Sequence, residues 1–140
     1  MIDPGYSPKR FAIAAHPSLK DASQQAEIIA MALKNLGAEI VEYGSIYDDN
    51  LKNELLAGSY DVLIALGGDG TILRAGHLCA KPDVPILGIN MGRFGFLTEV
   101  QNRQWESVLP DLLQGKYRIE QRMMLWAEHQ RNNLVLGGWD

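Results

Sequence analysis

Short, uninterrupted apolar runs constrain the fold of this chain more than any other feature. Strands with one face in water alternate apolar and polar residues, whereas strands covered on both faces of a parallel sheet read as continuous apolar segments. We expect such buried strands at 11–15, 61–66 and 85–89, with a further strand at 38–43. The chain is therefore predicted to contain a mostly parallel sheet with helices on both faces.

Segments of helical periodicity separate these strands. The first is expected to begin at a cap provided by Ser18 or Asp21 and to end before Gly37. Its apolar residues recur at steps of four and three: Ala22, Ala26, Ile29, Leu33 and Leu36. Further helices are expected at 51–56 (capped by Asp49 or Asn50), 71–79 and 103–113, the last shortened or kinked by Pro110. Alternation of strands and helices predicts an α/β, Rossmann-like, doubly wound fold.

The pattern changes after Gly115. Residues 117–128 read as extended, and 131–133 form a turn signal before a short apolar run at 134–136. We interpret this part as the first hairpin of a mainly β unit. The predicted domains are therefore an α/β domain at 1–116 and the beginning of a mainly β domain at 117–140.

Composition narrows the functional classes. The chain has 140 residues, of which 46% are hydrophobic and 21% charged, and its net charge is −4. This balance argues against a general nucleic-acid or membrane-surface binder. No apolar run approaches the ~20 residues needed to cross a bilayer, and no signal peptide is evident. The single cysteine, Cys79, reads as a small buried residue. We expect a cytoplasmic protein.

The segment Gly67-Gly68-Asp69-Gly70-Thr71 directly follows a predicted buried strand. Its glycines permit a sharp turn, positive φ values and the close approach of a phosphate to the backbone. The helix that follows would direct free amide groups and its positive dipole end at the same space. Asp69 can accept a proton from an attacking hydroxyl, help to hold a metal ion, or only cap the helix. Arg74 either reaches a phosphate or lies exposed on the helix.

A second glycine-rich segment, Gly88 to Leu97, follows the next predicted strand. Asn90 offers both donors and acceptors at the strand end, and Phe96 offers an aromatic face to a base. The alternative interpretation of Phe96 and Leu97 is that both side chains pack in the hydrophobic core. His16 could line the same cleft at the strand ends, although we interpret it as a loop residue. The chain has no P-loop, dinucleotide fingerprint, zinc pattern or serine-hydrolase context.

The two glycine-rich segments together closely resemble the bacterial-type NAD kinases. GGDGT is shared with lipid kinases and, more loosely, with phosphofructokinases, whereas the pattern G-x-N-x-G-x-x-G-F-L at 88–97 separates NAD kinases from them. A looser third element at 117–125 looks like the crossing into the family's second domain. The resemblance covers about residues 11–125.

The resemblance implies phosphorylation of the adenosine-ribose 2′-hydroxyl of NAD, which gives NADP. It implies ATP or polyphosphate as donor, a divalent metal ion (Mg²⁺ first), no nucleic-acid or membrane partner, and a homodimer or homotetramer. Asp69 would be the proton acceptor. The implied binding residues are Gly68, Asp69, Gly70, Thr71, Arg74, Asn90, Phe96 and Leu97.

Family members also carry an Asn-Glu or Asn-Asp motif in a second, mostly β domain, where it holds the NAD ribose. The chain ends at Gly138-Trp139-Asp140, before such a motif, so we expect these 140 residues alone to be inactive or nearly so. Two other readings stay open at this point. One is a non-catalytic nucleotide-binding domain, and the other is a lipid or sugar kinase of the wider GGDGT group.

Overall fold

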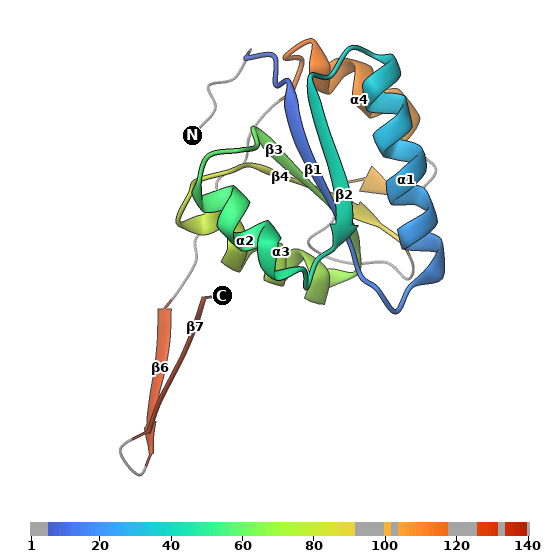
Figure 1. Cartoon of the computed structure of the whole chain (residues 1–140). Coiled ribbons are helices and arrows are strands. Elements are labelled where there is room, and N and C mark those ends of the chain that lie inside the picture. Colours follow the sequence, from blue (N-terminus) through green and yellow to red (C-terminus); the bar gives the residue numbers. More distant parts are fainter. Residues whose placement is uncertain (1–5, 92–99, 102–103, 118–125, 132–133, 140) are drawn as a thin grey trace.

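The computed structural model describes residues 6–91, 100–101, 104–117, 126–131 and 134–139 (Figure 1). Strands and helices alternate through the first part of the chain. The elements are β1 (Arg10–Ala15), α1 (Lys20–Asn35), β2 (Ile40–Ser45), α2 (Asp49–Leu56), β3 (Val62–Gly67), α3 (Asp69–Ala80), β4 (Ile86–Asn90), β5 (Val100–Gln101), α4 (Trp105–Leu113), β6 (Trp126–Arg131) and β7 (Leu134–Trp139).

The first five strands form one sheet in the order β2-β1-β3-β4-β5. Every neighbouring pair in this sheet is parallel. The predicted doubly wound α/β fold is confirmed. Strand order reverses between β1 and β3, because the chain passes from β1 outward to β2 and then returns across β1 to begin β3. In open parallel sheets, ligands bind beyond the carboxyl ends of the strands at such a switch point.

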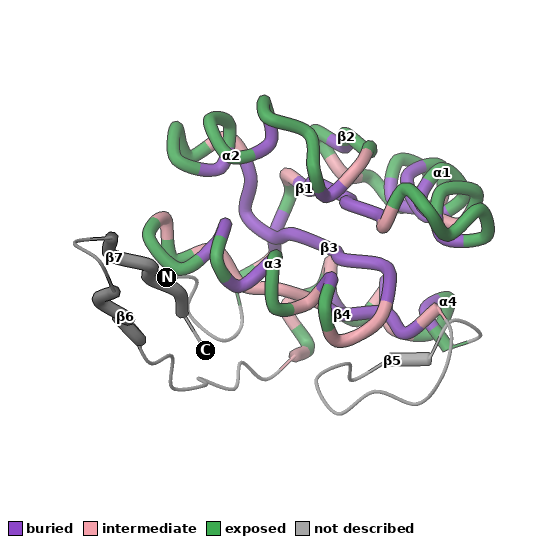
Figure 2. The backbone as a smooth tube through the Cα atoms, turned by 90° about the horizontal axis from the view of Figure 1, so that it is seen from below, coloured by how far each residue is buried: buried purple, intermediate pink, exposed green. Residues whose placement is uncertain are grey.

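Two apolar cores lie on opposite faces of the sheet. On one face, alternate residues of β1 and β3 pack with α1 and α4; on the other face, the intervening residues pack with α2 and α3. Figure 1 shows the two helix pairs on opposite sides of the sheet. All six residues of β3 are buried, as the tube in Figure 2 shows. Coverage of both faces explains why the strand sequences show no polar alternation.

Three helices end in the same way, each at a glycine with positive φ. Gly37, Gly58 and Gly115 have φ values of 101°, 78° and 76°. After α1, the Gly37 amide donates to Lys34 O, and the Ala38 amide donates to Leu33 O, which is the Schellman pattern. Ala38 thus belongs to the helix terminus. This explains why β2 begins at Ile40, two residues later than expected.

The helix starts were predicted less accurately than the helix ends. Leu19 occupies the N-cap position of α1 without a side-chain hydrogen bond, so the prediction of Ser18 or Asp21 was wrong. The cap of α2 is Asp48, whose carboxylate accepts from the Asn50 amide at 3.0 Å, so the predicted cap at 49 or 50 was too late. Helix α4 begins at Trp105, two residues later than expected, and continues three residues beyond Pro110.

The predicted hairpin is confirmed. Strands β6 and β7 pair antiparallel, with Arg131 opposite Leu134. Of the predicted turn at 131–133, Arg131 is the last residue of β6, and 132 and 133 lie outside the described residues. A search of the described residues for a helix long and apolar enough to span a membrane finds none.

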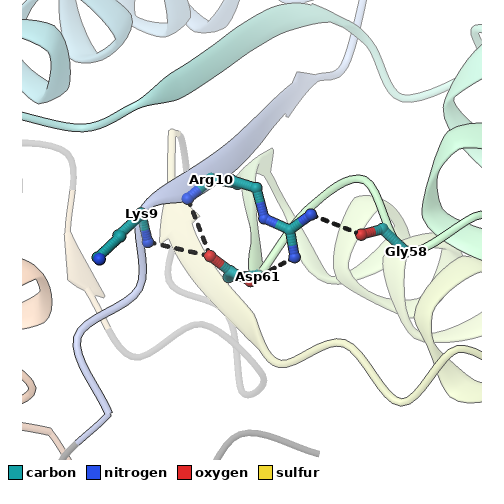
Figure 3. A network of polar contacts seen from close by, with 4 residues as sticks. All are labelled: Lys9, Arg10, Gly58 and Asp61. Carbon is teal, nitrogen blue, oxygen red and sulfur yellow. Dashed lines mark hydrogen bonds and ion pairs between the residues drawn. The ribbon is translucent and has the colours of Figure 1, made fainter.

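A buried carboxylate ties the amino ends of β1 and β3 together (Figure 3). Asp61, 9% exposed, accepts hydrogen bonds from the Lys9 and Arg10 amides, both at 3.0 Å, and from the Arg10 guanidinium at 2.9 Å. The same guanidinium donates to Gly58 O at 2.9 Å. Burial raises the pKa of Asp61, but the hydrogen bonds from Arg10 and Lys9 outweigh it and hold this pKa below its ordinary value.

We expect Asp61→Asn to lower the free energy of unfolding by ~1–3 kcal/mol at neutral pH, because hydrogen bonds to a charged group are lost. A carboxyl with a lowered folded pKa stabilises the protein above its unfolded pKa of about 3.9, and this contribution disappears as the pH falls through the folded pKa. The difference between the two proteins should therefore shrink below about pH 4. Urea unfolding at several pH values measures both effects.

Glu39→Gln is the matched control. Glu39 pairs with Lys9 at 3.8 Å, and both side chains are about 60% exposed, so the change should cost less than about 0.5 kcal/mol. Equal losses for the two variants would contradict the role assigned to Asp61.

Candidate active site

The β3–α3 turn brings a carboxylate to the switch point. Strand β3 ends at Gly67, Gly68 is the N-cap of α3, and the helix begins at Asp69, two residues earlier than expected. Asp69 therefore lies in the first helical turn rather than at the cap position, where a negative charge is favoured by the helix dipole. Because Gly68 carries no side chain, the cap position itself is open.

The glycines of this turn do not have the expected positive φ values. Within the described ranges, the glycines with positive φ are those at the three helix ends. Gly67 is required for another reason: a Cβ there would lie 2.3 Å from Thr71 Oγ1 and 2.7 Å from Thr71 Cβ. At Gly68 and Gly70, by contrast, an added Cβ meets nothing within 4 Å. Packing needs the first glycine, whereas the other two leave open space beside the backbone.

The two glycine-rich segments meet at this edge of the sheet. Strand β4 pairs with β3 so that Asn90 lies opposite Gly67, and the Met91 amide donates to Gly67 O at 3.2 Å. Asn90 is only 2% exposed and interacts with other residues of the protein. The structure therefore places Asn90 beside the end of β3, in the buried part of this edge. Phe96 and Leu97 lie outside the described residues.

Arg74 leaves α3 toward the end of β2. Its guanidinium carbon lies 4.7 Å from the ring centroid of Tyr47, and its Nε donates to Ile46 O at 3.3 Å. Arg74 is exposed, as one sequence interpretation allowed. It is nevertheless held in place by two residues of the β2–α2 loop.

His16 lies in the loop that follows β1, as predicted, and this loop runs beside the turn. Its amide donates to Leu66 O at 3.1 Å, immediately before Gly67. Its Nδ1 accepts from the Ser18 amide at 3.1 Å, so the ring proton of the neutral form is on Nε2. The ring meets Tyr47 edge to face, with centroids 5.8 Å apart.

Sequence reasoning named His16 as a possible residue of this edge and missed Tyr47. The available signal was position, because His16 directly follows β1 and Tyr47 comes two residues after the end of β2. Cys79, in contrast, is buried as predicted, and burial raises the pKa of its thiol to about 12, so it is inert as a nucleophile.

Comparisons with known proteins identify the family. A sequence model of the family described as "ATP-NAD kinase N-terminal domain" matches residues 47–117, just over half of the chain, including the β3–α3 turn. The chain belongs to the NAD kinase family. The NAD kinase of Moorella thermoacetica is 56% identical over 74 residues, which are 53% of this chain and 24% of that protein.

Other NAD kinases match over a longer part of the chain. The enzyme of Treponema denticola is 35% identical over 84% of this chain and 39% of its own length. That of Methanothermobacter thermautotrophicus is 37% identical over 86% of this chain and 44% of its own length. The chain thus spans less than half the length of these relatives.

A solved structure has the same fold. The crystal structure of yeast NADH kinase complexed with NADH superimposes with a TM-score of 0.67 over 94% of this chain and 44% of that one, at 15% sequence identity. This likeness supports the architecture of the sheet and its helices.

The glycines of the NAD kinase turn should differ sharply in their effect on stability. We expect Gly67→Ala to lower the free energy of unfolding by ~1–3 kcal/mol, because the new methyl group overlaps buried Thr71. Gly70→Ala should leave stability unchanged or slightly raised, since its methyl group meets open space and alanine favours helix. Thermal and urea unfolding compare the two. A Gly70→Ala protein destabilised as much as Gly67→Ala would contradict this assignment.

Proposed function

We propose that this chain is the nucleotide-binding part of an enzyme that phosphorylates the adenosine-ribose 2′-hydroxyl of NAD to give NADP. ATP or polyphosphate is the phosphoryl donor. The observation that carries the proposal is the β3–α3 turn, where open backbone at Gly68 and Gly70 meets the amino end of a 12-residue helix at the switch point. Unpaired amides at a helix start form a binding site for phosphate.

Asp69 is the proposed proton acceptor. As the 2′-hydroxyl oxygen attacks the terminal phosphorus, the new oxygen–phosphorus bond forms and the bond from phosphorus to the leaving phosphate oxygen breaks. Asp69 takes the hydroxyl proton, and the leaving diphosphate or shortened polyphosphate carries away the bonding electrons. The turn amides and the α3 dipole stabilise the charge that develops on the phosphoryl oxygens.

A divalent cation fits the donors at this turn. Mg²⁺ usually binds through one or two carboxylates and substrate phosphates and keeps several waters. Asp69 would hold such an ion, which would supply positive charge to neutralise the transferred phosphoryl group. In the described part of the chain, no three His, Cys, Asp or Glu side chains form a metal-binding group.

The remaining assignments extend the same proposal. Thr71 at the turn and Asn90 at the neighbouring strand end contact the nucleotide, while Phe96 and Leu97 line the NAD pocket. Residues 1–116 form the α/β domain, and 117–140 begin a mainly β domain. The protein acts in the cytoplasm as a homodimer or homotetramer, without a nucleic-acid or membrane partner.

Gly70→Ala tests whether nucleotide uses the open backbone. We expect the added methyl group to weaken the binding of ATP with Mg²⁺, or of NAD, by about tenfold or more, since it occupies the space a phosphate needs. Calorimetric titration measures both affinities, and the melting temperature confirms that the variant is folded. Unchanged affinity for both nucleotides would show that the turn is not part of the binding site.

Asp69→Asn separates binding from chemistry. In the complete enzyme of which we propose this chain to be a part, the variant should still bind nucleotide but lose NADP formation by about 10²–10⁴-fold, the usual contribution of a positioned base. A coupled NADP assay and calorimetry on the same samples provide the two readouts. NADP formation equal to that of the wild type would refute the base assignment, and phosphorylation of diacylglycerol instead of NAD would refute the substrate.

A further inference from the structure

Three neighbouring strands contribute to one stack of side chains at the carboxyl edge of the sheet. His16 follows β1, Tyr47 follows β2, and Arg74 belongs to α3, the helix after β3. These are adjacent strands in the order β2-β1-β3. The His16 and Tyr47 rings meet edge to face, and the Arg74 guanidinium lies over the Tyr47 ring. The stack therefore flanks the turn that holds Asp69.

The stack fixes one end of an otherwise mobile side chain. Arg74 is exposed and has several rotatable bonds, so binding a phosphate costs the entropy of ordering it. Here the ring of Tyr47 and the carbonyl of Ile46 already hold the guanidinium. Ile46 is fully buried and its amide donates to Ala15 O at 2.9 Å, which anchors the carbonyl side of this contact to β1.

The arrangement leaves Arg74 able to bind an anion. Its Nε–H is used by Ile46, whereas the two terminal nitrogens carry four further N–H donors. Within the described ranges, Arg74 makes no ion pair that would neutralise its charge. A guanidinium stacked on an aromatic face keeps its charge and its fork of donors.

We propose that Tyr47 is a positioning residue, which holds the Arg74 guanidinium ready for a phosphate of the bound nucleotide, and that His16 braces the ring of Tyr47. This inference rests on the proposed nucleotide site at the β3–α3 turn. Tyr47 is half exposed, at 51%, and its hydroxyl is not needed for the contact, so the ring face is what acts.

A double-mutant cycle on nucleotide affinity tests the proposal. ATP with Mg²⁺ and, in a second series, NAD are titrated into the wild type, Tyr47→Ala, Arg74→Ala and the double variant. For the nucleotide that Arg74 contacts, we expect Arg74→Ala to weaken binding about tenfold or more. Tyr47→Ala should weaken it about two- to fivefold, as expected for loss of an exposed cation–π contact. The double variant should bind no more weakly than Arg74→Ala.

Two controls separate positioning from a general structural role. Tyr47→Phe keeps the ring and should retain wild-type affinity. Tyr43→Ala removes a tyrosine of similar exposure, 49%, from β2, four residues before Tyr47, and should leave affinity unchanged. Additive losses in the cycle, an unaffected Tyr47→Ala protein, or a Tyr47→Phe protein as weak as Tyr47→Ala would overturn the inference.

The outcomes also distinguish this inference from the proposed function. If Arg74→Ala changes neither affinity, Arg74 is not a phosphate ligand and the role of Tyr47 is overturned. The proposed function then still depends on Gly70→Ala and Asp69→Asn. If Gly70→Ala also leaves nucleotide affinity unchanged and Asp69→Asn leaves NADP formation unchanged, the nucleotide site itself is refuted.

Discussion

The parallel pairing of β1 with β3 is the interaction on which the rest of the structure depends. These two buried strands meet where the strand order reverses, with Phe11 opposite Val62 and Ala15 opposite Leu66. Helices leave them toward opposite faces of the sheet, so the space beyond their carboxyl ends is bounded by α1 on one side and α3 on the other. The candidate site lies beyond these carboxyl ends, where the strand order reverses.

Polar contacts set the register of this pairing at both ends. At the amino edge, the Asp61 carboxylate accepts hydrogen bonds from the Lys9 and Arg10 amides and from the Arg10 side chain. At the carboxyl edge, the His16 amide donates to Leu66 O. A slip of one residue would turn the apolar side chains to the other face. It would also leave the Asp61 carboxylate buried without its donors, which is costly.

A close contact and a carboxylate lie together in the β3–α3 turn. Thr71 packs against Gly67 so tightly that no side chain fits at that position. Helix α3 begins at Asp69, which places the carboxylate in the first turn, at the positive end of the helix dipole. The outer two glycines stay open to a ligand. One motif therefore combines a packing requirement with a binding surface.

Local patterns in the amino-acid sequence were sufficient for the fold class, the principal turn and every element except the two-residue strand β5. Continuous apolar runs predicted the buried strands because burial on both faces removes alternation, and Gly37, Gly58 and Gly115 predicted helix ends because they accept positive φ cheaply. Helix starts were misplaced because α1, α3 and α4 begin without a side-chain cap, so no capping residue in the sequence marks their first turn. Only the tertiary structure brought His16, Tyr47 and Arg74 together, and buried Asn90 beside the end of β3. Those contacts join residues far apart in the chain, and they depend on the order of strands in the sheet, which no local pattern encodes.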